Sequence, residues 1–183
     1  MDQGKNNLRK VIFTGLWAAI IYIGIWLLRI PVPAPVGNPF IHFGNALTVL
    51  AVLFLGTRDG MIAGAIGLGG FDVLNGYAAT SWLTVLEVVV LASVVGGLFK
   101  LFHDQDRPTW HIIVIGIAAG LTKIVTSYLV SIVEALMAGT AMKVAVVAAF
   151  VSLPATVINS ISTAIIVPIL YYILKRVFKS IRH

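Results

Sequence analysis

The sequence predicts an all-α integral membrane protein: one domain over residues 1–183, built as a six-transmembrane-helix bundle with both termini cytoplasmic. Apolar residues make up 59% of the chain and charged residues 11%, whereas soluble domains are usually about half apolar and about a quarter charged. The apolar residues form runs that approach the roughly 20 residues a membrane helix needs. Basic residues gather at the ends of these runs. This composition disfavours an ordinary soluble enzyme and excludes a disordered chain.

Three apolar runs occupy the N-terminal half of the chain. The first, residues 8–30, is longer than the apolar core of a signal peptide, and no small-residue cleavage site follows it. Residues 31–40 contain four prolines and predict an extended loop. The second run, residues 43–55, is too short to span a bilayer without help. The third, residues 59–75, ends at an Asn-Gly turn.

The C-terminal half holds three longer runs. The fourth and fifth, residues 82–101 and 110–137, flank the strongly polar loop 103–108. The sixth, residues 144–174, is predicted as one span although it contains two prolines. Six spans place both termini on one side of the membrane. The loops expected on the opposite, outward side are 31–42, 75–81 and 137–143.

The distribution of basic residues predicts which side of the membrane holds the termini, because cytoplasmic loops carry an excess of Lys and Arg. Arg29 and Lys143 fall on the outward side, and Lys123 lies inside a span. The residues on the side of the termini are Lys5, Arg9, Lys10, Arg58, Lys100, Arg107, Lys175, Arg176, Lys179 and Arg182. The net charge of +6 is therefore interpreted as an orientation signal in a lipid bilayer, which we expect to be a bacterial cell membrane. No nucleic-acid partner is predicted.

Motifs for catalysis, metal binding and nucleotide hydrolysis are missing from the sequence. There is no phosphate-binding loop, so the chain itself is not expected to hydrolyse ATP. The histidines show no metal-ligand spacing, and the chain has no cysteines. The glycine-rich run 64–72 lies inside an apolar span, where close helix packing explains it. We therefore expect no catalytic residue, no metal and no cofactor.

Small residues recur at four-residue spacing in several spans, which lets helices approach closely in lipid. Packing within the bundle explains the series Gly56, Gly60 and Gly64, and the pair Gly116 and Gly120. The first span offers a second interpretation. There, small residues stand beside a large aromatic residue, which favours the docking of a partner membrane subunit. The predicted docking residues are Gly15, Ala18 and Ala19.

Ionisable side chains inside a span are energetically unfavourable and usually face a cavity or a partner. Four are present: Asp72, Glu87, Lys123 and Glu134. Ser127 and Ser131 share the helical face of Lys123. Together with Asn45 and Asn159, the acidic groups converge on the outward half of the bundle, beside aromatic residues of the outward loops. Aromatic walls with few polar anchors suit a small, polar, ring-shaped solute.

Each of these polar groups also has a structural interpretation. Lys123 could form an ion pair with Glu87 or Asp72, and Glu134 could lie in water at the interface. Asp72 could cap the following turn, and Asn159 could simply bridge two helices. Glu87 is the strongest candidate for a ligand contact, because a fixed carboxylate can bind a ring nitrogen or a hydroxyl group.

Three short motifs in residues 41–78 resemble a known transporter family. They are Gly44-Asn45, Leu55-Gly56 followed by Gly60, and Asp72 followed by Gly76-Tyr77. With the six predicted spans, they make nearly the whole chain similar to a substrate-binding S-component of an energy-coupling factor (ECF) vitamin transporter. The resemblance is to the riboflavin-type branch, and within it to members assigned to hydroxymethylpyrimidine or pyridoxine. Many members have aspartate where this chain has Asn45.

The resemblance implies a vitamin-binding subunit that captures its ligand from outside and delivers it with a transmembrane coupling subunit and two ATPase subunits. In such proteins the first loop gates the pocket, and the fourth to sixth spans supply ligand contacts, which adds His42 to the candidates. The docking contact of the family corresponds to Gly15 and Ala19. The predicted substrate-binding residues are His42, Asn45, Asp72, Tyr77, Trp82, Glu87, Lys123, Ser127, Ser131 and Asn159.

Other functions remain open at this point. The vitamin could instead be pantothenate or riboflavin. The chain could also be a stand-alone proton-coupled carrier, which the buried charges would permit, although no internal repeat supports it. An intramembrane enzyme would have to use Ser127 with Lys123, the only nucleophile and base at the same depth.

Overall fold

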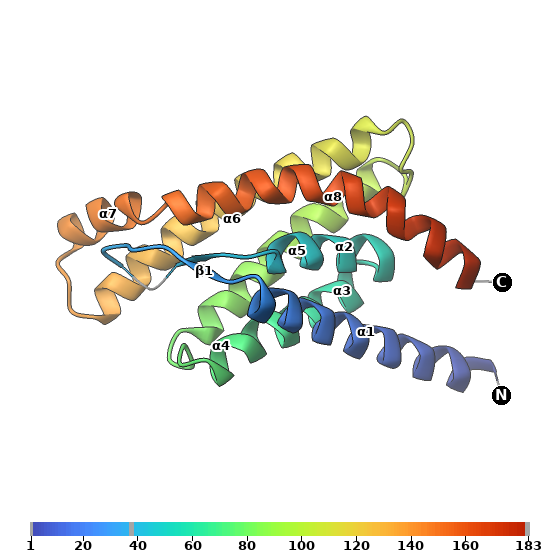
Figure 1. Ribbon diagram of the computed structural model, residues 1–183, viewed down its shortest axis with the longest axis horizontal. Helices are drawn as coiled ribbons and strands as arrows, with labels where there is room; N and C mark the ends of the chain where they lie inside the picture. Colours follow the sequence, from blue (N-terminus) through green and yellow to red (C-terminus); the bar gives the residue numbers. More distant parts are fainter. Residues whose placement is uncertain (1, 37–38, 182–183) are drawn as a thin grey trace.

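The computed structural model describes residues 2–36 and 39–181, and the side chains of 7–36 and 39–176. Lys5, Lys179, Arg182 and His183 therefore lie outside the side chains described. The elements, shown in Figure 1, are α1 (Asp2–Leu27), β1 (Ile30–Pro31), β2 (Phe40–Ile41), α2 (Gly44–Leu55), α3 (Thr57–Gly64), the π-helical segment η1 (Ala65–Gly69), α4 (Gly70–Leu74), α5 (Ser81–Leu101), α6 (Trp110–Met137), α7 (Met142–Val151) and α8 (Pro154–Ile181).

Four of the described helices are long and apolar enough to cross a membrane, in agreement with the predicted membrane class. They comprise Asn7–Leu27, Ser81–Leu101, Trp110–Met137 and Pro154–Arg176. Two further apolar helices, α2 and α7, are shorter. The count of six full spans therefore stays a prediction.

The predicted sixth run is wrong as a single helix. It divides at residues 152–153 into α7 and α8, and Pro154 is the first residue of α8. A proline disfavours helical backbone in the residue before it but is well suited to the first turn of a helix. Pro168 remains inside α8 without ending it.

The expectation of a purely α-helical chain also needs one correction. α1 ends at Leu27, short of the predicted residue 30, and the chain then forms an antiparallel ribbon of two residues in each strand. In this ribbon Ile30 pairs with Ile41, and Pro31 pairs with Phe40. Proline has no N–H to donate, which restricts it to sheet edges such as this one.

The helix α2 lies in the centre of the bundle, which explains how so short a helix can be so apolar. Residues 44–46 and 48–53 are all buried, as expected for a helix that is hydrophobic on every side. Thr48 satisfies its hydroxyl group within the helix by donating to the Gly44 carbonyl at 2.8 Å. Surrounded by protein, α2 does not have to match the thickness of the bilayer.

Most of the glycines predicted to pack helices do so. Gly56 is the exception, because a Cβ atom there would meet nothing within 4 Å, and its φ of +89° places it in the turn between α2 and α3. A Cβ atom at Gly60 would lie 2.4 Å from the Cα atom of Val52 in α2. A Cβ atom at Gly67, in η1, would lie 2.8 Å from the Ala18 carbonyl oxygen in α1. At Gly120, in α6, the Ser160 carbonyl oxygen of α8 would be 2.9 Å away. The helices therefore meet backbone to backbone at these points.

Replacing Gly60 by alanine should lower the free energy of unfolding by about 1–3 kcal/mol, because the new methyl group has to push α3 away from the α2 backbone. Reversible unfolding in mixed detergent micelles would measure this. Gly70→Ala is the matched control, because a Cβ atom there would meet no heavy atom within 4 Å. Equal stability of the two variants would contradict the close approach.

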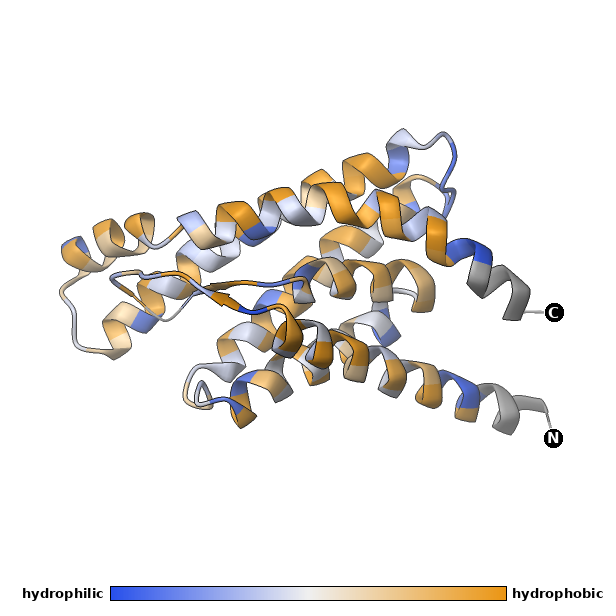
Figure 2. Ribbon diagram, in the orientation of Figure 1, coloured by the Kyte–Doolittle hydropathy of each residue, from blue (hydrophilic) through white to orange (hydrophobic). Residues whose placement is uncertain are grey.

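The two ends of the bundle differ in character. The start of α1, the end of α8 and the turn between α5 and α6 lie at one end, as Figure 1 shows. The β1–β2 ribbon, the α4–α5 turn and the α6–α7 turn lie toward the other, which we call the loop end. Strongly hydrophilic residues concentrate at helix ends and turns, while the helix shafts are largely hydrophobic (Figure 2).

Candidate functional site

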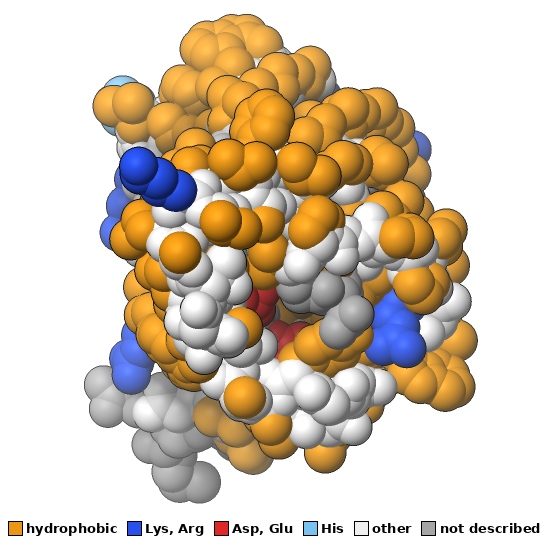
Figure 3. Space-filling view, turned by 90° about the vertical axis from the view of Figure 1, so that its left-hand side faces the viewer, with side chains coloured by type: hydrophobic (Ala, Val, Ile, Leu, Met, Phe, Trp, Pro, Cys, Tyr) orange, Lys and Arg blue, Asp and Glu red, His pale blue; other side chains and the backbone are white. Residues whose placement is uncertain are grey.

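A cavity of about 160 Å³ lies between β2, α2, α4, α5, α6 and α8. Figure 3 looks onto the loop end and shows acidic side chains at the bottom of a hollow there. The walls therefore come from segments spread over most of the chain, and folding is needed to assemble them.

Nine of the ten residues predicted to bind substrate line this cavity. They are His42, Asn45, Asp72, Tyr77, Glu87, Lys123, Ser127, Ser131 and Asn159. Trp82 does not: its side chain is 48% exposed on α5, while the next residue, Leu83, is buried. One residue corresponds to about 100° around a helix, so Trp82 faces away from the bundle.

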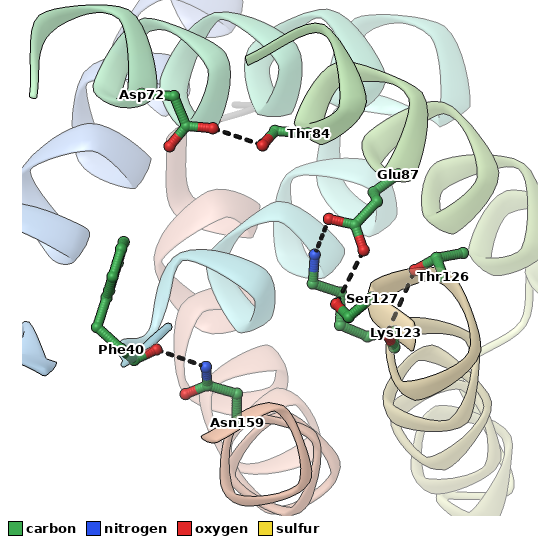
Figure 4. A network of polar contacts seen from close by, with 8 residues as sticks. All are labelled: Phe40, Asp72, Thr84, Glu87, Lys123, Thr126, Ser127 and Asn159. Atoms are coloured by element: carbon green, nitrogen blue, oxygen red, sulfur yellow. Dashed lines mark hydrogen bonds and ion pairs between the residues drawn. The ribbon is translucent and has the colours of Figure 1, made fainter. Parts of the chain in front are cut away.

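The centre of the site is a buried ion pair between two helices (Figure 4). The Lys123 ammonium group on α6 donates to Glu87 Oε2 on α5 at 2.5 Å, and the two side chains are 16% and 9% exposed. Ser127 donates to the other carboxylate oxygen, Glu87 Oε1, at 2.9 Å. The ion-pair interpretation of Lys123 is thus correct, with Glu87 as its partner.

A second carboxylate, Asp72, approaches the cavity from α4. Thr84 on α5 donates to Asp72 Oδ2 at 2.5 Å, and the backbone N–H groups of Asn75 and Tyr77 donate to the Asp72 carbonyl at 3.3 and 2.8 Å. The side chain therefore joins α4 to α5, and the backbone of the same residue closes the turn. Glu134, near the end of α6, also lines the cavity and is half-buried.

Asn159 on α8 holds the strand β2 in place. Its Oδ1 atom accepts from the His42 backbone N–H at 2.9 Å, and its Nδ2 atom donates to the Phe40 carbonyl at 2.9 Å. Asn159 thus bridges α8 to the first loop instead of to another helix. The hydroxyl group of Ser152 adds a third contact by accepting from the Val36 backbone N–H at 3.2 Å.

Replacing Asn159 by alanine should accelerate amide hydrogen exchange at His42 about tenfold or more, because two hydrogen bonds worth about 1 kcal/mol each are lost. Exchange followed by mass spectrometry on peptides covering residues 39–43 would measure this. Ser160→Ala is the control, since the Ser160 hydroxyl group has no partner among the described residues. Unchanged exchange in Asn159→Ala would show that the loop is held by other contacts.

His42 is neutral in this site. Burial, with a smaller contribution from the charge of Lys123, lowers the pKa of His42 to about 3. Its Nδ1 atom accepts from the Gly44 backbone N–H at 3.0 Å, so the single ring proton is on Nε2. Between pH 5 and 8 this residue therefore acts as a hydrogen-bonding group of constant charge.

Aromatic rings form one wall of the cavity. The ring centroid of Phe40 lies 5.7 Å from that of Phe71 and 6.1 Å from that of Tyr77. The Arg29 guanidinium group lies 5.5 Å from the Phe40 ring centroid and 5.7 Å from that of Phe71. This spacing is typical of cation–π contacts. The wall can therefore stack on a ring and accept a positive charge.

Several lining residues were not predicted. Thr84 precedes Glu87 on α5 and Thr80 lies just before that helix, while Ser152 and Thr156 precede Asn159. Thr84 lies three residues before Glu87 and Thr156 three before Asn159, so helical spacing alone could have placed them on the same faces. Phe71 precedes Asp72 directly, and nothing in the sequence distinguishes it from the other apolar residues of that run.

The three predicted docking residues of α1 have different environments. Gly15 and Ala19 are exposed, and a Cβ atom at Gly15 would meet nothing within 4 Å. Ala18 is 4% exposed and packs inside against η1. Only Gly15 and Ala19 remain available to a partner.

Comparisons with known proteins give a family from a family model and a fold from a solved structure. The family model described as ECF-type riboflavin transporter, S component, matches residues 5–176. A solved S component of a bacterial ECF transporter superimposes with a TM-score of 0.70 over 94% of this chain and 99% of that one, at 21% identity. UPF0397 proteins of Streptococcus pneumoniae strains Hungary19A-6 and CGSP14 are 31% identical over 98 residues, which is 54% of this chain and 51% of theirs. The alignment thus spans about half the length of these relatives.

Proposed function

Because this chain belongs to the family of ECF-type riboflavin transporter S components, we propose that it is the vitamin-binding subunit of an ATP-driven importer in the cell membrane. The family is one of transporter components and not of enzymes. Helices of membrane-spanning length agree with that class.

The observation that carries the proposal is the cavity at the loop end. Polar groups from three membrane-length helices, α5, α6 and α8, converge there beside an aromatic wall. Polar groups at such depth are energetically unfavourable in a membrane protein, so their presence usually indicates a function. A ligand that enters from the outward side would meet these groups directly below the first loop.

A small single-ring vitamin, similar to hydroxymethylpyrimidine or pyridoxine, fits the cavity best. Sites for drug-sized ligands usually measure about 300–1,000 Å³, and this cavity, of about 160 Å³, is smaller. Riboflavin, with three fused rings and a ribityl chain, would need a considerable expansion. Pantothenate carries a carboxylate and would meet the acidic side chains of the cavity.

Import would require partners that the chain itself does not supply. We propose that Gly15 and Ala19 dock against a transmembrane coupling subunit, which in turn joins two ATPase subunits. With both termini in the cytoplasm, the loop end faces outward and captures the vitamin. The strand β2, held by Asn159, would act as the gate of the cavity.

Binding of a vitamin in the absence of ATP and of other subunits tests this proposal. The purified chain in detergent is expected to show a higher melting temperature with at least one member of a panel of water-soluble vitamins, in keeping with mass action. A panel without any stabilising member would refute it. Uptake by the chain alone in proteoliposomes, driven by a pH gradient, would instead favour the proton-coupled carrier.

A further inference from the structure

The cavity holds more negative than positive charge. Among the described residues that line it, three are carboxylates, namely Asp72, Glu87 and Glu134, and one is an ammonium group, that of Lys123. His42 is neutral, and the Arg29 guanidinium group lies behind the aromatic wall. Figure 3 shows acidic side chains at the bottom of the hollow.

In the described part of the chain, only one of the three carboxylates has an ion-pair partner. Lys123 is within ion-pair distance of Glu87, and the other ion pair in the described part of the chain joins Lys175 to Asp106, away from the cavity. Asp72 receives a hydrogen bond from the uncharged Thr84. Glu134 lies within hydrogen-bonding range of the uncharged Thr80 and within electrostatic range of Asp72, Glu87 and Lys123. Asp72 and Glu134 are half-buried, so a cation between them would relieve an unfavourable arrangement.

A second observation, independent of the carboxylates, indicates that a ligand completes the site. Asn45 lines the cavity and is 3% exposed. Its Nδ2 atom has no hydrogen-bond partner in the described part of the chain. A buried donor without a partner costs about 1–3 kcal/mol, and an acceptor atom on a bound molecule would remove that cost.

The aromatic wall is the third feature of the cavity that favours a positively charged ligand. Phe40 and Phe71 already hold the Arg29 guanidinium group at cation–π distance. Phe40, Phe71 and Tyr77 also line the cavity, and aromatic rings of this kind stack favourably on flat heterocycles. A positively charged ring would therefore be matched by the wall as well as by the carboxylates.

From this arrangement we infer that the site selects a small single-ring heterocycle bearing a positive charge, such as an amine. The cationic group lies between Asp72 and Glu134, and an acceptor atom of the ligand receives a hydrogen bond from Asn45 Nδ2. This inference rests on the proposed function, because it names the substrate class of the same cavity.

Three ligands with one ring system and different charge test the inference. Pyridoxamine carries an aminomethyl group where pyridoxine carries a hydroxymethyl group and 4-pyridoxic acid a carboxylate. Isothermal titration of the whole chain in nanodiscs should show pyridoxamine binding at least about tenfold more tightly than pyridoxine, because hydrogen bonds between charged groups are stronger than those between neutral groups. The acid should bind at least about tenfold more weakly than pyridoxine, because its carboxylate would meet the carboxylates of the cavity. Glu134→Gln and Asp72→Asn should each reduce this preference.

Asp59→Asn is the matched control. Asp59 lies in the first turn of α3 and does not line the cavity, so this variant should keep the full preference. Because Asp72 also joins α4 to α5, Glu134→Gln decides the question if Asp72→Asn fails to fold.

Equal affinity for the three compounds, or a preference for the acid, would overturn the inference while leaving vitamin binding intact. No binding of any of the three would overturn the substrate class named here. The proposed function would fail separately, and only if the wide vitamin panel also gave no stabilisation.

Discussion

Replacing Lys123 by methionine is expected to lower the free energy of unfolding by about 3–5 kcal/mol, the range for breaking a buried ion pair by removing one partner. The change leaves Glu87 buried without its cation, in a cavity that also contains Asp72 and Glu134. Methionine retains most of the volume of lysine, so the loss would come from charge and not from a void. Reversible unfolding in mixed micelles would measure it.

Two further variants isolate the ion pair. Lys100→Met removes an exposed lysine at the end of α5 and should change stability by less than about 0.5 kcal/mol. The double variant Lys123→Met with Glu87→Gln removes both charges and should recover much of the lost stability, because replacing both members of a buried pair is often nearly neutral. A double variant as unstable as Lys123→Met would contradict the pairing.

Replacing both Gly15 and Ala19 by leucine is expected to reduce vitamin uptake in cells at least about tenfold, because bulky residues prevent the close approach of helices that a small-residue seam allows. Ligand binding by the purified variant should be unchanged. Both residues are exposed, so the substitutions create no clash inside the bundle.

Gly97→Leu is the matched control for this experiment. Gly97 is an exposed glycine of α5 with nothing within 4 Å of a Cβ atom, and it lies outside the α1 seam. Its uptake should stay normal. Normal uptake by the Gly15 and Ala19 variant, or copurification of that variant with the ATPase subunits, would remove α1 from the docking surface.

Hydropathy predicted the membrane class, and intramembrane polarity predicted the charged residues that line the cavity. Both succeed because a polar group inside a bilayer has few permitted environments. The effect of each proline on the helices was harder to predict. Pro154 begins a new helix, whereas Pro168 lies inside the same helix without ending it. The sequence contains both prolines without indicating which one interrupts the helix.

The partners of the site residues were the least predictable feature. Asn159 holds Phe40, which is 119 positions away, and no spacing rule reaches that far. Glu87 was expected to be the main ligand contact, yet both of its oxygens accept hydrogen bonds from α6. Trp82 was expected to line the cavity and does not, whereas Thr84, which was not expected to, does. The rotation of α5 about its axis decides this, and it depends on neighbours that the sequence does not reveal.

Mass spectrometry of the purified chain tests the central claim most directly. The protein, extracted in mild detergent without added vitamin and then denatured, is expected to release one small, single-ring vitamin in a ratio approaching one per chain. Intact complexes from the same membranes should contain a coupling subunit and ATPase subunits. A chain that is correctly folded, carries no vitamin and copurifies with none of these subunits would contradict the account.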